Sequence, residues 1–206
     1  MASTTRDQRV EVVKKLAKQN GGLLTTSQIE AAGIGRAAIA EFVSRGLLSK
    51  EGRGVYYDAD EFPDEWQILQ SRSVKLIFSY GSALYLWGIS DRIPHIWDVT
   101  VPQGFNASRI KKRNEKTRFH YVSADKWSIG VAETTTPYGN VVRLYDKERC
   151  VVDLVRRRGA VDSQLYLQTL RAYFADGKGD NIKLIRYAKA FNVERLVRDY
   201  MEILTQ

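Results

Sequence analysis

Residues 24–57 constrain the fold more than any other part of this chain. A short helical pattern ends at Gly33, a second runs over residues 35–45, and a strand candidate follows at residues 48–51. Gly52-Arg53-Gly54 then forms a turn that leads into a second strand candidate. Two helices followed by a hairpin predict a winged helix-turn-helix, a motif whose second helix enters the major groove of DNA.

Both helices of this segment have one apolar side. Their apolar residues recur three or four positions apart, which gives each helix a stripe to bury against a core. Thr25 or Thr26 can cap the first helix, because a hydroxyl oxygen accepts from the free N–H groups of the first turn. Gly33 stands where the end of that helix needs a positive φ angle, which glycine adopts without steric penalty.

The residues outside these stripes are the candidates for contacting DNA. Short polar groups at the first helix can meet phosphates, small residues and an arginine at the second can approach base edges, and later cations can contact flanking phosphates. The candidates are Thr26, Ser27, Gln28, Arg36, Ala37, Ala38, Arg45, Lys50 and Arg53. The alternative is a helical hairpin on which Arg36 is an ordinary surface residue.

Composition places the chain among globular proteins with room for two domains. It has 206 residues, of which 44% are hydrophobic and 27% charged. No apolar run approaches the ~20 residues needed to span a bilayer, and residues 1–8 are polar, without the apolar region of a signal peptide. The single cysteine, Cys150, excludes an internal disulfide and gives no sign of an oxidising compartment. We therefore expect a cytoplasmic protein.

The charge of the chain favours a polyanionic partner. Its formal net charge is +8 and its pI is near 9.5. Residues 1–60 hold nine basic and seven acidic residues, so only +2 of that charge lies there. Six basic residues and one acid fall within residues 109–118, and residues 156–158 form a second basic cluster. Each cluster is either a solvated loop or helix end, or a set of DNA-backbone contacts that adds affinity without sequence choice.

Beyond residue 57 the pattern becomes that of a mixed α+β domain. Residues 58–64 are acidic and contain Pro63, so we expect a DNA-binding domain at residues 1–60 and a second domain at residues 61–206. Strand candidates lie at residues 96–101, 120–122, 129–134 and 141–144. Helical patterns lie at residues 6–20, 64–72, 82–87, 146–157, 162–175, 181–191 and 193–204. The predicted class is α+β, with an N-terminal winged helix-turn-helix, a mixed α/β domain and a helical C-terminal tail.

One alternative gives the second domain a catalytic role. Gly81-Ser82, Asp91 and Asp98 weakly resemble the signature of nucleotidyltransferases, which hold Mg²⁺ between two carboxylates on one strand. Thr100 occupies the place of the second carboxylate, so this clamp is incomplete. The chain has two histidines and one cysteine, too few for a zinc site. We therefore predict a protein that is not an enzyme, with no catalytic residue, metal site or cofactor.

Three segments in order resemble the AbiEi-type antitoxins of type IV toxin–antitoxin (abortive infection) systems. The first is the winged segment, residues 24–56. The second is residues 82–89, Ser-Ala-Leu-Tyr-Leu-Trp-Gly-Ile, where the family usually shows Ser-Ala-Leu, an aromatic or aliphatic residue, and Gly-Leu. The third is residues 142–154, which resemble the family's Asp-x-Glu-Arg-Thr-x-x-Asp-Leu element. Cys150 stands where that element usually has Thr.

The resemblance implies a protein with two roles in phage defence. The N-terminal domain would bind inverted repeats in its own promoter, as double-stranded DNA, and repress the operon. The second domain would counter a nucleotidyltransferase-like toxin encoded alongside, by opposing the toxin's effect without a stable complex. An alternative is a transcriptional regulator whose second domain senses a small molecule.

The third segment supplies the candidate residues of the antitoxin domain. They are Asp146, Glu148, Arg149 and Asp153. Their charges suit either an ion-pair network that fixes the start of a helix or an interaction surface. The sequence shows no heptad pattern or obvious apolar face, which favours a monomer in solution that pairs only on DNA.

Overall fold

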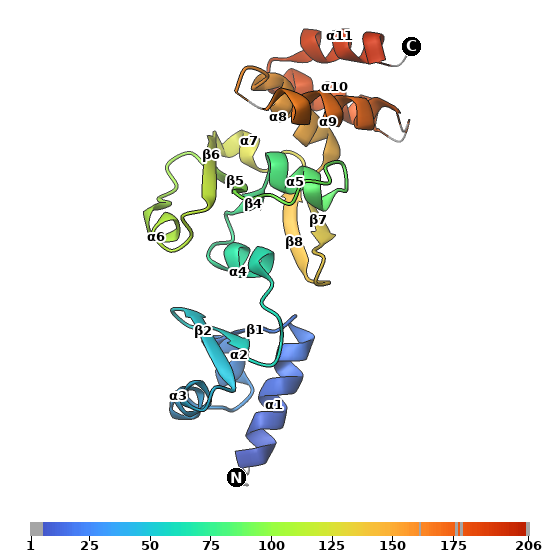
Figure 1. Ribbon diagram of the computed structural model, residues 1–206. Helices are drawn as coiled ribbons and strands as arrows, with labels where there is room; N and C mark the ends of the chain where they lie inside the picture. Colours follow the sequence, from blue (N-terminus) through green and yellow to red (C-terminus); the bar gives the residue numbers. More distant parts are fainter. Residues whose placement is uncertain (1–5, 161, 176, 178, 205–206) are drawn as a thin grey trace. The chain divides into compact units, whose positions relative to one another are not determined.

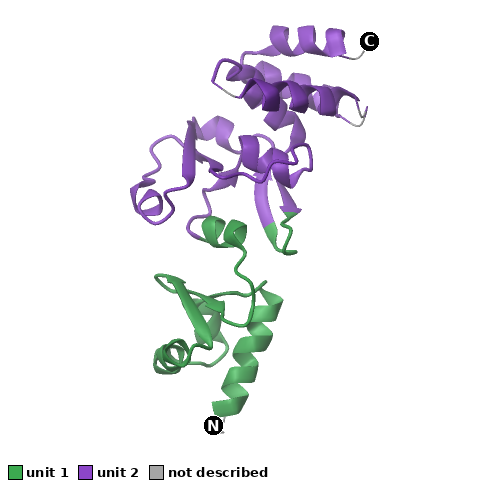
Figure 2. Cartoon of the chain, viewed as in Figure 1, with its two compact units in different colours: residues 1–71, 135–141 green, residues 72–134, 142–206 purple. Residues whose placement is uncertain are grey.

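Two compact units make up the computed structural model, in which residues 6–160, 162–175, 177 and 179–204 are described. Unit 1 contains residues 1–71 and 135–141, and unit 2 contains residues 72–134 and 142–206 (Figure 2). Residues 1–5 of the polar N-terminal segment lie outside the described residues. No helix among the described residues has both the length and the apolar character needed to cross a membrane.

Unit 1 is a set of helices around a small antiparallel sheet (Figure 1). Its elements are α1 (Arg6–Gln19), β1 (Leu23–Thr25), α2 (Thr26–Ala31), α3 (Arg36–Ser44), β2 (Leu48–Gly52), β3 (Val55–Asp58) and α4 (Glu65–Ser71). The strand order is β1-β3-β2, and the register of β2 against β3 shifts between Lys50 and Gly52. The helices α2 and α3 followed by the β2–β3 hairpin are the predicted winged helix-turn-helix.

The core of unit 1 forms where the apolar stripes of its helices meet. Its buried members are Val13, Ala17, Leu24, Ile29, Ile34, Ile39, Phe42 and Leu48. Full burial of side chains of this size contributes roughly 1.5–3 kcal/mol each. The stripes expected on the two helices of the winged segment are therefore confirmed, and their burial fixes which side of α2 and α3 faces solvent.

A buried carboxylate holds the two chain segments of unit 1 together. Asp64 is 0% exposed, and its Oδ1 accepts from the backbone N–H groups of Trp66 and Gln67 in the first turn of α4, at 3.0 and 3.3 Å. Its Oδ2 accepts from the Thr136 hydroxyl at 2.6 Å and from Asn140 Nδ2 at 2.8 Å. These bonds explain why unit 1 extends past residue 60, the boundary expected from the acidic stretch. Whether function divides at the same place stays a prediction.

Unit 2 contains a mixed five-stranded sheet with order β6-β5-β4-β8-β7 and a group of helices (Figure 1). Its sheet and crossover elements are β4 (Ile77–Phe78), α5 (Tyr80–Leu86), β5 (Trp97–Pro102), α6 (Ser108–Lys111), β6 (Thr117–Val122), α7 (Ala124–Trp127), β7 (Val131–Thr135) and β8 (Val141–Tyr145). The C-terminal helices are α8 (Lys147–Arg156), α9 (Ser163–Ala175), α10 (Asn181–Ala190) and α11 (Glu194–Leu204). Strands β4 and β5 are antiparallel, whereas β5 runs parallel to β6 and β4 parallel to β8.

The predicted α+β class, with its winged segment and helical C-terminal tail, is confirmed. Four short elements differ from the prediction, and one of them is the two-residue strand β4, which lies outside all the strand candidates. Strand β1 takes three residues that the sequence suggests lead directly into a helix, and α6 and α7 are helices of four residues each. Elements this short carry too few residues to show a period, so only tertiary contacts define them.

Candidate nucleic-acid interface

A capping box fixes the start of α2. Thr25 Oγ1 accepts from the backbone N–H of Gln28 at 3.2 Å, and Gln28 Oε1 accepts from the backbone N–H of Thr25 at 2.8 Å. The expected threonine cap is therefore confirmed at Thr25. Gln28 Nε2 also donates to Asn20 Oδ1 at 3.0 Å. The oxygen and the nitrogen of the Gln28 carboxamide therefore both form hydrogen bonds to residues of unit 1. Gln28, one of the candidate DNA contacts, therefore helps to orient α2 through hydrogen bonds to Thr25 and Asn20.

The turn between the two helices is short and leaves the start of α3 open. Gly33 has φ +81°, as its place after α2 predicts, and Ile34 then turns into the core. Gly35 is the N-cap of α3, and no side chain caps the helix there. The free N–H groups of a helix start, together with the helix dipole, favour an anion such as a phosphate.

Arg36 is the most exposed charged group at the start of α3. Its side chain is 81% exposed, and its Nε donates to Glu30 Oε1 at 2.7 Å. An exposed pair of this kind is worth about 0–1 kcal/mol, so a stronger acceptor on DNA can replace it. Ala37 is exposed beside Arg36, whereas Ala38 packs partly against the core. The guanidinium and a small residue thus stand together at the solvent side.

The wing places one cation at its tip. Gly52 pairs with Val55, so Arg53 and Gly54 form a two-residue turn in which Gly54 has φ +72°. The backbone N–H of Thr26 donates to the carbonyl of Gly54 at 2.9 Å, which ties the wing to the start of α2. The structure therefore brings the Arg53 turn and Thr26 together.

The remaining candidates lie on the exposed surface of unit 1. Ser27 and Lys50 are exposed on α2 and β2, and Arg45 is exposed at the end of α3, with Arg45 Nη1 3.7 Å from Glu41 Oε1. Arg45 and Arg36 are separated by the length of α3, about 13 Å for nine residues. Phosphate contacts at these positions would therefore fall at separate places along a backbone.

The architecture of unit 1 is that of a winged helix-turn-helix domain. Residues 11–57 match the family described as "Transcriptional regulator, AbiEi antitoxin". This match confirms the resemblance to the AbiEi-type antitoxins and contains the first of the three resembling segments in full, whereas the other two lie outside it.

The fold of the chain is also similar to a solved structure. It is the crystal structure of the Rv2827c protein from Mycobacterium tuberculosis, with a TM-score of 0.59 and 18% identity. The similarity covers 86% of this chain and 70% of that one. At this identity the likeness concerns the fold alone. No curated protein matches the chain.

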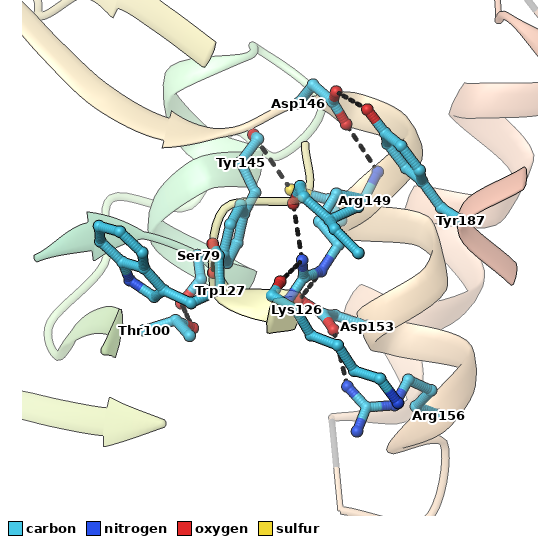
Figure 3. A network of polar contacts seen from close by, with 12 residues as sticks. Ser79, Thr100, Lys126, Trp127, Tyr145, Asp146, Arg149, Asp153, Arg156 and Tyr187 are labelled. Atoms are coloured by element: carbon cyan, nitrogen blue, oxygen red, sulfur yellow. Dashed lines mark hydrogen bonds and ion pairs between the residues drawn. The ribbon is translucent and has the colours of Figure 1, made fainter. Parts of the chain in front are cut away.

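In unit 2, the four candidate antitoxin residues form a buried network at α8, and Figure 3 shows three of them, Asp146, Arg149 and Asp153. Their exposed fractions are 8% for Asp146, 7% for Glu148, 0% for Arg149 and 2% for Asp153. The sequence left open whether they form an internal ion-pair network or an interaction surface. Their burial and mutual contacts are those of an internal network.

Arg149 is the centre of this network. Its Nε donates to Asp153 Oδ2 at 3.0 Å, and its Nη1 donates to the carbonyls of Lys126 and Ile129 at 2.9 and 2.7 Å (Figure 3). The guanidinium carbon lies 4.1 Å from the ring centroids of both Tyr145 and Phe191. The side chain therefore joins α8 to α7, to the loop after α7 and to the end of α10.

Two carboxylates of the network share one lysine from α10. Lys183 Nζ lies 3.0 Å from Asp146 Oδ2 and 3.1 Å from Glu148 Oε2. Burial alone would raise the pKa of Glu148, but hydrogen bonds from the Asp180 N–H, its own N–H and Lys183 outweigh it and hold that pKa below its usual value. Burial raises the pKa of Tyr173, and the Glu148 carboxylate that accepts its hydroxyl raises it further.

A second polar cluster in unit 2, on β5 and β6, was not expected from the sequence. Asp98 Oδ1 lies 2.7 Å from His120 Nε2, and His120 Nδ1 lies 3.1 Å from Arg157 Nη1. A guanidinium can only donate, so Nδ1 accepts and Nε2 carries the proton given to Asp98. Tyr80, with φ +45°, stacks on the His120 ring at 4.2 Å between centroids. Strand pairing of β5 with β6 creates this cluster, so no local motif could reveal it.

This cluster bears on the nucleotidyltransferase alternative. Ser82 Oγ accepts from the backbone N–H of Asp98 at 2.8 Å, so the Gly-Ser turn and the aspartate do meet. Thr100 donates to Ser79 at 2.9 Å in a buried position, and Asp91 is exposed in a loop. Among the described residues, no three His, Cys, Asp or Glu side chains gather as metal ligands. The geometry offers one carboxylate where two-metal chemistry uses at least two.

Proposed function

We propose that this protein is the antitoxin of a type IV toxin–antitoxin system in the cytoplasm. Unit 1 binds inverted repeats of double-stranded DNA in its own promoter and represses the operon. The second domain, from residue 61 onward, counters a nucleotidyltransferase-like toxin without a stable complex and without catalysis. The protein is a monomer in solution and pairs on DNA. The observation that carries the proposal is the winged helix-turn-helix with Arg36 exposed at the uncapped start of α3.

The contacts on DNA follow from the exposed side of unit 1. Arg36 and the small residues after it face base edges, where an arginine donates two hydrogen bonds to guanine. Thr26 and Ser27 meet phosphates beside α2, and Gln28 contributes by orienting that helix. Lys50, Arg45 and Arg53 contact flanking phosphates, which adds affinity and salt dependence without sequence choice. The full proposed set is Thr26, Ser27, Gln28, Arg36, Ala37, Ala38, Arg45, Lys50 and Arg53.

Arg36→Ala is expected to weaken operator binding by about 1–3 kcal/mol, because a bidentate contact to one base pair is lost. Fluorescence anisotropy with the promoter duplex and with a random duplex of equal length measures the effect. The matched control is Arg171→Ala, which removes one exposed charge from α9 and should leave operator affinity unchanged. Equal weakening on both duplexes would show instead that Arg36 contacts phosphate.

Antitoxin action is tested by growth rescue with the full chain, because residues 61–71 and 135–141 are structural parts of unit 1. Cells expressing the neighbouring open reading frame from an inducible promoter should survive when this protein is co-expressed. The Arg36→Ala/Arg53→Ala variant should rescue equally well, because toxin and antitoxin are then made from promoters the protein does not control. Failure of the wild-type chain to rescue would favour a transcriptional regulator whose second domain senses a small molecule.

A further inference from the structure

Unit 2 carries a surface that combines unpaired cations with aromatic rings. It consists of Arg109, Lys111, Lys112, Arg113, Phe119 and Tyr121, and is called here the basic-aromatic surface. These residues come from α6, the turn that follows it, and β6, and none of them belongs to the winged segment. A ligand of this surface is therefore considered separately from the operator DNA proposed for unit 1.

The parallel crossover between β5 and β6 builds this surface (Figure 1). The crossover carries α6, and Ala107 and Ile110 anchor it because they are only 4% and 8% exposed. With these two side chains turned inward, Arg109 and Lys111 point to solvent, and Lys112 and Arg113 continue the exposed run. The cations are therefore presented by a fixed element of the fold.

The four cations of the surface have no acidic partner among the described residues. Other exposed arginines do have one, since Arg36, Arg45 and Arg198 pair with glutamates within 4 Å. The only acid within residues 109–118 is Glu115, and none of the ion pairs between described residues involves it. A run of unneutralised cations attracts a polyanion, such as the phosphate backbone of a nucleic acid chain.

The aromatic rings lie on the same side of β6. Phe119 and Tyr121 are two residues apart, so they share one face of the strand about 7 Å from each other. Lys111 Nζ lies 5.6 Å from the Phe119 ring centroid, which links the cations to this row. Tyr121 is 42% exposed, on the edge strand of the sheet. An exposed ring beside cations can stack a nucleobase, a contact worth about 1–3 kcal/mol.

Base stacking distinguishes a single strand from a duplex. In duplex DNA the bases are paired and stacked on each other, so Tyr121 has no ring face to meet. A plain edge-protecting role explains exposed lysines and arginines near β6, but it gives no reason for an exposed tyrosine beside them. We propose that the basic-aromatic surface binds a single-stranded nucleic acid, with phosphates on the cations and a base stacked on Tyr121. This inference does not depend on the operator proposal.

The test uses the full-length protein and a labelled, unstructured RNA of about 12 nucleotides, within the site size of such surfaces. Tyr121→Ala should weaken RNA binding roughly 5- to 100-fold, whereas Tyr121→Phe should keep it because the ring remains. Operator duplex affinity should be unchanged in both variants. The control Tyr138→Ala removes a 58% exposed tyrosine from unit 1 and should leave RNA binding intact.

A second set of variants tests the cations. Lys111→Gln/Lys112→Gln/Arg113→Gln should weaken RNA binding and flatten its salt dependence, because up to three phosphate contacts are lost. The triple control Arg171→Gln/Lys189→Gln/Arg195→Gln removes the same charge from the C-terminal helices and should have a much smaller effect. Arg36→Ala should bind RNA like the wild type, which separates this surface from the operator site.

Three outcomes would overturn the inference. The wild-type chain could fail to bind the RNA at low salt, Tyr121→Ala could bind it as well as the wild type, or the two triple variants could lose affinity equally.

Discussion

Arg149→Ala is expected to destabilise unit 2 by about 3–5 kcal/mol, because it removes one partner of a buried charge pair. The substitution leaves the carboxylate of Asp153, which is 2% exposed, with Arg156 as its remaining ionic partner. It also leaves the carbonyls of Lys126 and Ile129 without their donor and opens a cavity between the rings of Tyr145 and Phe191. Native-state hydrogen exchange of the α8 amides measures the loss within unit 2.

Two variants separate the effect of losing the charge of Arg149 from the effect of losing its side-chain volume. Arg156→Ala removes a 32% exposed arginine from the same carboxylate and should cost about 1 kcal/mol or less. Arg149→Met/Asp153→Leu removes both charges while keeping apolar volume, and should be clearly more stable than Arg149→Ala. If Arg149→Ala proved as stable as Arg156→Ala, the network would not be what holds α8 in place.

Asp64→Ala is the second large effect, with an expected loss of about 3–5 kcal/mol in unit 1. The helix α4 loses its capping carboxylate, which alone costs about 0.5–2 kcal/mol. The hydroxyl of Thr136 and the carboxamide of Asn140 lose a buried acceptor, and an unsatisfied buried donor costs about 1–3 kcal/mol. Urea unfolding followed by hydrogen exchange at residues 135–141 measures the change.

Asp60→Ala is the matched control for this prediction. Asp60 is four residues away, its side chain is 72% exposed, and its ion pair with Lys14 lies in solvent, so its removal should change stability little. Asp64→Asn keeps an oxygen for the cap and should lose less than Asp64→Ala. Equal stability of the Asp64→Ala and Asp60→Ala chains would show that the buried carboxylate does not stabilise unit 1.

The elements that the sequence predicts well are those whose signal is local. The helix α3 has an apolar stripe and glycines at both ends, and Arg53 lies between glycines that define a two-residue turn. These features act over a few residues, so periodicity and turn chemistry identify them. Strand β1 is not predicted from the sequence, because its three residues form a strand only by pairing with β3, which begins 30 residues after β1 ends.

The sequence named the charged residues of α8 but could not decide whether they are buried, because their burial also depends on distant segments. Arg149 and Asp153 are four residues apart, and on sequence alone that spacing fits an exposed helical ion pair equally well. They are buried by contact with the carbonyls of Lys126 and Ile129 and with the ring of Phe191, which distant segments supply. The pair of Asp98 and His120 likewise arises only when β5 lies beside β6.

The placement of residues 135–141 with unit 1 has a practical consequence for dissecting the protein (Figure 2). A gene fragment stopped at codon 71 would encode the winged segment but omit Thr136 and Asn140, and so would expose Asp64 without its two side-chain donors. Such a fragment lacks part of unit 1, and a DNA affinity measured on it would understate that of the intact protein. Point substitutions in the full-length chain are the sounder way to assign functions to the two units.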